Sequence, residues 1–187
     1  MRLRRVVQRI GSDRGVLDFQ RNHFELLGLP LAYSVDPARL ESGYRALQSQ
    51  VHPDRFAAAT EAERRVAMQW ATRANEAYRT LRDPVGRARY LLSLKGFDTG
   101  EETNTSMPPD FLMQQMEWRE AVAEAAGAHD TSRLQSLRGE LSASRADMLR
   151  MLERAIDADA NYDAGCSLVR KLRFLEKLDD EIDEALQ

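Results

Sequence analysis

The chain has 187 residues, 43% hydrophobic and 30% charged, which suits one or two small globular domains. A formal net charge of −3, with both signs mixed along the chain, gives no reason to expect nucleic-acid binding, because such binding is typical of a basic domain or stripe. The single cysteine, Cys166, excludes an internal disulfide framework, and no apolar run approaches the roughly 18 residues that span a membrane.

The N-terminal stretch, residues 1–20, is rich in arginine and poor in acidic residues. Three interpretations compete: a flexible tail, a start-site artefact, or an Arg-rich segment like a transit peptide. The stretch lacks the apolar core of a secretory signal. We therefore treat it as an N-terminal extension that is poorly ordered or loosely docked.

Four helices are predicted between residues 24 and 96. A short helix over 24–29 precedes a second that begins at the N-cap Asp36, with Pro37 at its first position, and runs to about Val51. Thr60 and Glu63 form a capping-box pattern at the start of the third helix. That helix carries a stripe of mostly small residues, which lets two antiparallel helices approach closely: Ala67, Ala71, Ala74, Tyr78 and Leu81. The fourth helix begins at Asp83-Pro84 and ends at Gly96.

A polar loop, His52-Pro53-Asp54, separates the second and third predicted helices. The apolar face of the second helix runs up to His52, and Pro53 ends that helix because the residue before a proline is disfavoured in the α region. The loop then presents one imidazole and one carboxylate to solvent at the tip of a helical hairpin, and neither has an obvious partner within the loop. The alternative is that the segment is simply a turn.

The second half of the chain predicts a helical bundle after a linker over residues 97–109, which has no apolar period and contains Gly100 and Pro108-Pro109. Helical patterns cover 110–126, a segment that begins after Asp130-Thr131, and about 164–186. Short connections favour antiparallel neighbours, so a three-helix bundle is expected. No strand-period segment is evident, and the predicted fold class is all-α.

The helix predicted over 110–126 carries two apolar stripes on opposite sides. One contains Phe111, Trp118, Val122 and Ala125, and the other contains Leu112, Met113 and Met116. The second stripe is bordered by three carboxylates, Glu117, Glu120 and Glu124, and Phe174 lies off the main core face of the last helix, where it could join this stripe. Such a patch is typical of a protein-binding surface. Two plainer interpretations stay open: the stripe packs under the N-terminal half or the linker, and the carboxylates form a solvated face.

Three blocks in this order resemble the J-domain of DnaJ-type co-chaperones: Phe24–Pro30, His52-Pro53-Asp54 and Asn75–Pro84. Further blocks resemble the specialised J-proteins of iron–sulfur cluster assembly, the HscB family: Arg87–Asp98, Phe111–Glu120 and Val169–Leu178. The resemblance covers the chain from about Asn22 to the C-terminus. It implies a J-domain over 21–96, a linker over 97–109 and a C-terminal scaffold-binding bundle over 110–187.

The resemblance also implies two partners. The loop and the preceding helix would engage an HscA- or DnaK-type chaperone and stimulate its ATP hydrolysis, through His52, Pro53, Asp54, Arg55 and Arg45. The C-terminal helices would bind the scaffold protein IscU and deliver it to that chaperone, promoting cluster transfer, through Leu112, Met113, Met116, Glu117, Glu120, Glu124 and Phe174. Many J-domains have lysine where Arg55 stands here. The alternative is a general DnaJ-type co-chaperone for unfolded clients.

An enzyme is the other class of function to weigh. The three histidines, His23, His52 and His129, are scattered, no Cys/His cluster has metal-ligand spacing, and Gly-rich phosphate loops are absent. We therefore expect no intrinsic enzyme activity, no cofactor and no metal site. Some eukaryotic relatives carry a cysteine-rich metal site that this chain cannot build, which favours a bacterial-type cytoplasmic protein.

Overall fold

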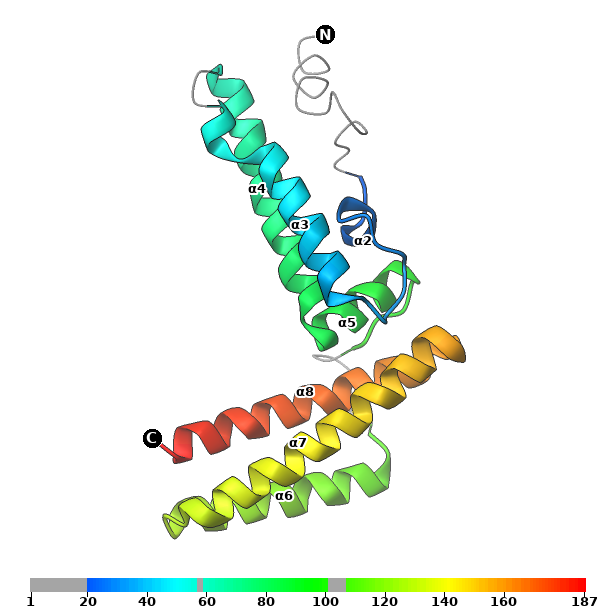
Figure 1. Cartoon of the computed structure of the whole chain (residues 1–187). Coiled ribbons are helices and arrows are strands. Elements are labelled where there is room, and N and C mark those ends of the chain that lie inside the picture. Colours follow the sequence, from blue (N-terminus) through cyan, green and yellow to red (C-terminus); the bar gives the residue numbers. More distant parts are fainter. Residues whose placement is uncertain (1–19, 57–58, 101–106) are drawn as a thin grey trace. The chain divides into compact units, whose positions relative to one another are not determined.

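The computed structural model describes residues 20–56, 59–100 and 107–187, so the predicted extension over 1–20 lies outside the described residues except for Gln20. Every regular element among the described residues is helical (Figure 1). The chain divides into two compact units, Met1–Arg87 and Ala88–Gln187. The predicted class is confirmed: a helical hairpin with short flanking helices, followed by a three-helix bundle.

The first unit contains α2 (His23–Leu26), α3 (Pro37–Val51), the 3-10 turn η1 (Pro53–Phe56), α4 (Glu61–Arg82) and the start of α5 (Pro84–Leu94). The predicted caps are present. The Asp36 side chain accepts a hydrogen bond from the Ala38 amide, and Thr60 forms a reciprocal capping box with Glu63. The first helix is shorter than the 24–29 that we predicted, and it begins with a capping box between Asn22 and Glu25.

α3 and α4 pack as an antiparallel hairpin (Figure 1). Helical spacing puts Leu40, Tyr44, Leu47 and Val51 on the apolar face of α3 that runs up to His52. Leu40, Leu47 and Val51 are buried, and Tyr44 is half-buried. The buried face of α4 differs from the predicted stripe, because Trp70 and Ala77 are fully buried whereas Ala71 and Tyr78 are half-buried. Ala67, Ala74 and Leu81 are buried as predicted, so the buried face is centred only about 40° away from the stripe that we read from the small residues.

Gly43 on α3 shows how closely the chain approaches itself in this unit. A Cβ atom placed there would lie 2.2 Å from the backbone carbonyl oxygen of Leu27. Only glycine allows this approach without a shift of the backbone. The segment after α2 is thus fixed against α3.

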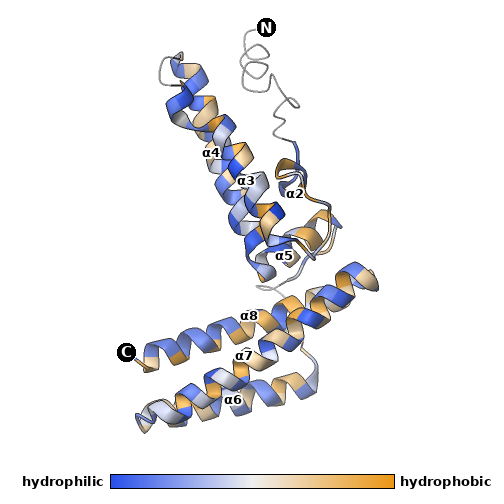
Figure 2. Ribbon diagram, in the orientation of Figure 1, coloured by the Kyte–Doolittle hydropathy of each residue, from blue (hydrophilic) through white to orange (hydrophobic). Residues whose placement is uncertain are grey.

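The second unit contains the end of α5, then α6 (Pro109–Gly127), α7 (Thr131–Glu153), a π-helical segment η2 (Arg154–Ala158) and α8 (Tyr162–Ala185). α6 and α8 run in the same direction, with α7 antiparallel to both (Figure 1). Each of these helices carries both hydrophilic and hydrophobic positions (Figure 2). Helical spacing predicts a core face for these helices, and most of its members are buried in α7, η2 and α8: Leu134, Leu137, Leu141, Met148, Leu152, Ile156, Leu168, Leu172, Leu175 and Ile182. Leu186, which the same spacing assigns to the core face, is only half-buried.

The segment between α5 and α6, predicted as a linker, contacts α8 in its described part. The Phe97 ring lies 5.1 Å from the Tyr162 ring, and Thr99 is buried. The Arg170 guanidinium donates a 2.8 Å hydrogen bond to the Thr99 carbonyl oxygen. Residues 97–100 are therefore held on the second unit, although they show no apolar period.

Candidate functional site

The hairpin loop, His52 to Phe56, is positioned by the last turn of α3. Val51 is fully buried, while His52 takes an extended conformation (φ −60°, ψ 130°), as expected before a proline. The chain then enters η1. Val51 is buried and the residues after it turn towards solvent. The side chain of His52 is therefore 51% exposed, and that of Asp54 is 89% exposed.

Contacts within the hairpin loop correct one expectation from the sequence, because His52 and Asp54 are partners of each other. The Asp54 amide donates a 3.3 Å hydrogen bond to His52 Nδ1, and Asp54 Oδ2 lies 3.6 Å from the same nitrogen. Arg55 is held as well, because its guanidinium donates to the Ser49 carbonyl oxygen at 2.9 Å.

Arg45 projects from the exposed face of α3 and is tied to a small network. Its Nε donates to Glu41 Oε1 at 2.7 Å, and the Tyr78 hydroxyl of α4 donates to Glu41 Oε2 at 2.6 Å. The Tyr78 hydrogen bond, followed by the one from Arg45, lowers the pKa of Glu41. The Tyr44 ring stacks on Tyr78 with centroids 4.3 Å apart. The contact with Glu41 holds the Arg45 side chain against α3, yet three-quarters of that side chain remains exposed.

α6 separates its two apolar stripes as the sequence predicted. Phe111, Trp118, Val122 and Ala125 are buried, whereas Leu112, Met113 and Met116 are 41%, 62% and 73% exposed. The three carboxylates that border the second stripe, Glu117, Glu120 and Glu124, are also exposed. Exposed methionines rimmed by carboxylates offer a surface that adapts to the shape of a protein partner.

Phe174 of α8 lies at the edge of this surface. Its half-buried ring packs edge-on against Phe111, with centroids 6.0 Å apart at 83°. It therefore reaches α6, as the sequence analysis suggested. We call the whole surface the α6 patch: Leu112, Met113, Met116, Glu117, Glu120, Glu124 and Phe174.

Two cations beside the α6 patch were not among the predicted site residues. The Arg119 guanidinium lies 5.5 Å from the Phe174 centroid, and Lys171 Nζ lies 4.9 Å from the Phe111 centroid. Position 119 is seven residues after Leu112, which puts both on one side of a helix. That spacing is the signal that would have pointed to Arg119.

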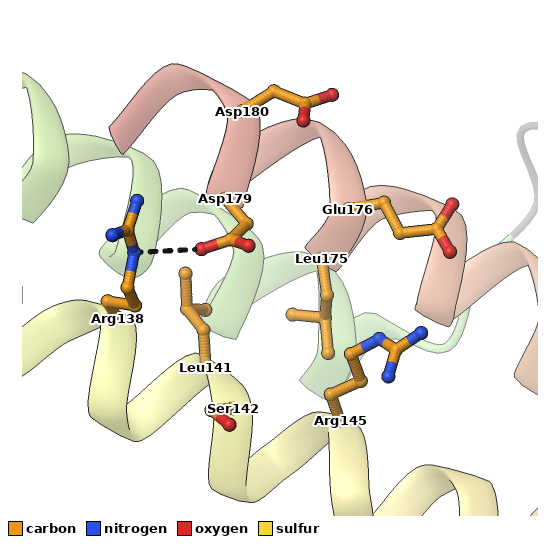
Figure 3. Close-up of a pocket in the computed structure, with 8 residues that line it drawn as sticks. All are labelled: Arg138, Leu141, Ser142, Arg145, Leu175, Glu176, Asp179 and Asp180. Carbon is orange, nitrogen blue, oxygen red and sulfur yellow. Dashed lines mark hydrogen bonds and ion pairs between the residues drawn. The ribbon is translucent and has the colours of Figure 1, made fainter. Parts of the chain in front are cut away.

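A shallow groove of about 410 Å³ lies between α7 and α8 (Figure 3). Arg138 of α7 pairs with Asp179 at 3.3 Å and with Asp183, so it joins the two helices. Leu141 and Leu175 lie between the helices, and Asp180 points away from α7 (Figure 3). The ion pairs of Arg138 thus hold the two helices that line the groove together.

The second unit also holds the single cysteine. Cys166 is buried, and burial raises the pKa of its thiol, so it stays protonated at neutral pH. Among the described residues, no group of three histidine, cysteine or acidic side chains is placed to hold a metal ion. Across the same residues, no helix combines the length and the apolar character needed to cross a bilayer.

Comparisons with known proteins find relatives that cover most of the chain. The family model described as "HSCB C-terminal oligomerisation domain" matches residues 107–183. The "Co-chaperone protein HscB homolog" of Burkholderia multivorans is 49% identical over 172 residues, covering 92% of this chain and 98% of that protein. Among solved structures, HscB from Vibrio cholerae is 38% identical with a TM-score of 0.75, covering 88% of this chain and 96% of that one. Human co-chaperone HscB is 27% identical with a TM-score of 0.84, covering 92% and 87%.

Proposed function

The chain belongs to the HscB family of co-chaperones, and we propose that it stimulates ATP hydrolysis by an HscA- or DnaK-type chaperone and delivers an IscU-type iron–sulfur scaffold protein to it. The first role is assigned to the hairpin loop together with Arg45. The second role is assigned to the α6 patch. The iron–sulfur cluster travels on the scaffold as cargo, and its transfer to acceptor proteins is the outcome of delivery.

The observation that carries the proposal is the division of α6 into a buried and an exposed apolar stripe. Leu112, Met113 and Met116 are not needed for the core, because Phe111, Trp118 and Val122 fill it. Exposing three large apolar side chains together costs solvation free energy in the free protein. A partner that covers them recovers that free energy, which supports a binding role for the α6 patch.

The hairpin loop supports the chaperone role in a different way. His52 follows the buried Val51 in an extended conformation, and its imidazole and the Asp54 carboxylate are both exposed to solvent, with Nδ1 and Oδ2 3.6 Å apart. Polar groups that already contact each other lose less entropy on binding, so this pair is suited to recognition by a partner. Neither side chain contributes to the core, and their exposure therefore suits a contact with another protein.

The experiment measures both roles with purified proteins. Calorimetry reports the affinity of the chain for an IscU-type scaffold protein, and a steady-state assay reports ATP hydrolysis by an HscA-type chaperone with and without the chain. We expect saturable scaffold binding and stimulated hydrolysis, with a further increase when scaffold is present. A reduced, unfolded test protein serves as the competitor: if it displaces the scaffold or binds equally well, the chain is a general co-chaperone and the proposal is wrong.

A further inference from the structure

Arg45 is held by a carboxylate that is itself held by the neighbouring helix. The Arg45 Nε donates to Glu41 Oε1 at 2.7 Å, and the Tyr78 hydroxyl of α4 donates to Glu41 Oε2 at 2.6 Å. Each oxygen of the carboxylate therefore has its own donor, one from each helix. The Tyr78 hydrogen bond lowers the pKa of Glu41 and raises the pKa of Tyr78, so at neutral pH the acceptor is ionised and the donor keeps its proton.

Tyr78 is fixed in turn by the packing of α3 against α4. Its ring stacks on the Tyr44 ring, with centroids 4.3 Å apart and planes inclined by 22°, and both residues are half-buried. The Tyr44 hydroxyl donates a 2.8 Å hydrogen bond to Asn75 Oδ1 and accepts one of 3.1 Å from Gln48 Nε2. A continuous chain of contacts therefore runs from the packed seam between α3 and α4 to the Glu41 carboxylate.

A second ion pair in the same unit shows what the anchored carboxylate adds. Arg65 and Glu61 on α4 have the same four-residue spacing, but they lie 3.3 Å apart, and both side chains are largely exposed. Exposed pairs at this spacing contribute little, because two long side chains must be ordered to form them. The Tyr78 hydrogen bond orders the Glu41 carboxylate beforehand, so Arg45 is restrained more firmly than Arg65.

The contact through Nε leaves the outer edge of the Arg45 guanidinium open. Among the described residues, neither Nη nitrogen of Arg45 has a hydrogen-bond partner, and most of the side chain is exposed. A guanidinium carries its donors in one rigid plane, so the hydrogen bond at Nε also sets the direction in which the Nη groups point. Those groups can donate two parallel hydrogen bonds to a carboxylate of another protein.

We propose that Glu41 and Tyr78 are positioning residues for chaperone docking, which hold Arg45 so that its Nη edge meets a carboxylate of the chaperone. This inference rests on the proposed stimulation of the chaperone. An arginine that is already oriented loses less entropy on binding, so the network increases the affinity of docking. The negative charge of Glu41 opposes an acidic partner, but salt and water screen that repulsion at an exposed site.

A steady-state ATPase assay with a purified HscA-type chaperone, titrated with the full chain, separates docking from activation. Tyr78→Phe removes the hydroxyl and keeps the stacked ring. It should raise the half-saturating concentration of the chain by roughly twofold to tenfold and leave the maximal stimulation unchanged. Glu41→Ala should have at least the same effect. Glu61→Ala, the matched control with the same change in net charge, should shift the half-saturating concentration by less than about twofold.

A double-mutant cycle with Arg45→Ala distinguishes positioning from a general structural role. Arg45→Ala alone should raise the half-saturating concentration. In that background Tyr78→Phe should have no further effect, because no guanidinium is left to orient. A Tyr78→Phe effect of equal size in both backgrounds would overturn the inference.

Three other results would also overturn the inference. They are an unchanged half-saturating concentration in Tyr78→Phe, the same in Arg45→Ala, and tighter docking in Glu41→Ala, which would show that the carboxylate competes with the chaperone for Arg45. Each would leave the proposed stimulation intact, whereas an unsubstituted chain that fails to stimulate hydrolysis would refute the proposed function itself. The melting temperature is measured for each variant, and if Tyr78→Phe or Glu41→Ala folds poorly, the other decides the case.

Discussion

Truncation of the exposed stripe on α6 offers a quantitative prediction. Complete burial of a leucine or methionine side chain contributes about 1.5–3 kcal/mol. Leu112 is 41% exposed and Met116 is 73% exposed, so a partner that covers them gains about 0.6–1.2 and about 1.1–2.2 kcal/mol respectively. Leu112→Ala and Met116→Ala should therefore weaken scaffold binding by about threefold to eightfold and by about sixfold to fortyfold.

Substitutions in the exposed stripe should barely change the stability of the free protein, because the side chains that fill the core lie on the buried stripe of α6. Leu112→Ala and Met116→Ala should each change the free energy of unfolding by less than about 0.5 kcal/mol. Trp118→Ala should cost about 3–5 kcal/mol, because Trp118 is buried. Met151→Ala is the matched control for binding: Met151 is 57% exposed on α7, outside the α6 patch, and its loss should leave the affinity unchanged.

Scaffold calorimetry and urea unfolding of the free protein check these values. A large loss of stability in Met116→Ala with unchanged affinity would mean that the two stripes have been assigned the wrong way round. Equal effects of Met116→Ala and Met151→Ala on affinity would show that general surface hydrophobicity, rather than the α6 patch, governs binding.

Three further predictions concern the first unit. His52→Gln and Asp54→Asn should each abolish stimulation of the chaperone ATPase while the melting temperature of the free protein stays nearly constant, since both side chains are exposed; wild-type stimulation by either variant would remove the hairpin loop from the proposed role. Tyr78→Phe should raise the pKa of Glu41 towards its ordinary value, because the Tyr78 hydroxyl is the main cause of the lowering, and carboxyl NMR titration measures it. Since folding lowers this pKa, the contribution of Glu41 to stability is present at neutral pH and is lost as the pH falls through the folded-state value, and a titration of Tyr78→Phe identical to wild type would contradict this assignment. Gly43→Ala should destabilise the protein by about 1–3 kcal/mol in urea unfolding, because the new Cβ meets the Leu27 carbonyl oxygen, and a neutral result would show that the backbone there yields easily.

Local chemistry explains which parts of the fold were predictable. Asp36 and Thr60 cap their helices through hydrogen bonds to residues two and three positions ahead, so short-range sequence patterns contain the whole signal. The two stripes of α6 are separated by helical periodicity alone. Periodicity could not show that the stripe of Leu112, Met113 and Met116 is exposed, because its exposure depends on whether other parts of the chain pack against it.

The missed features depend on contacts between distant segments. Trp70 is fully buried in α4, although the small residues suggested a face centred about 40° away, because packing against neighbouring helices sets the rotation of a helix. The π-helical segment Arg154–Ala158 interrupts a pattern that reads as one continuous helix. Arg119 meets Phe174 across two helices, and no local pattern specifies that contact.

The proposed role as a delivery factor requires both surfaces on one chain, and one ATPase measurement tests that requirement directly. Three reactions each contain the chaperone and a limiting amount of scaffold. One receives the Asp54→Asn chain, another receives the double variant Leu112→Ala/Met116→Ala, and the last receives both chains together. The first chain keeps the α6 patch and the second keeps the hairpin loop. We predict that the mixture gives no more hydrolysis than the double variant alone, well below the wild type with scaffold. Full recovery of wild-type hydrolysis by the mixture would contradict delivery of the scaffold by a single molecule.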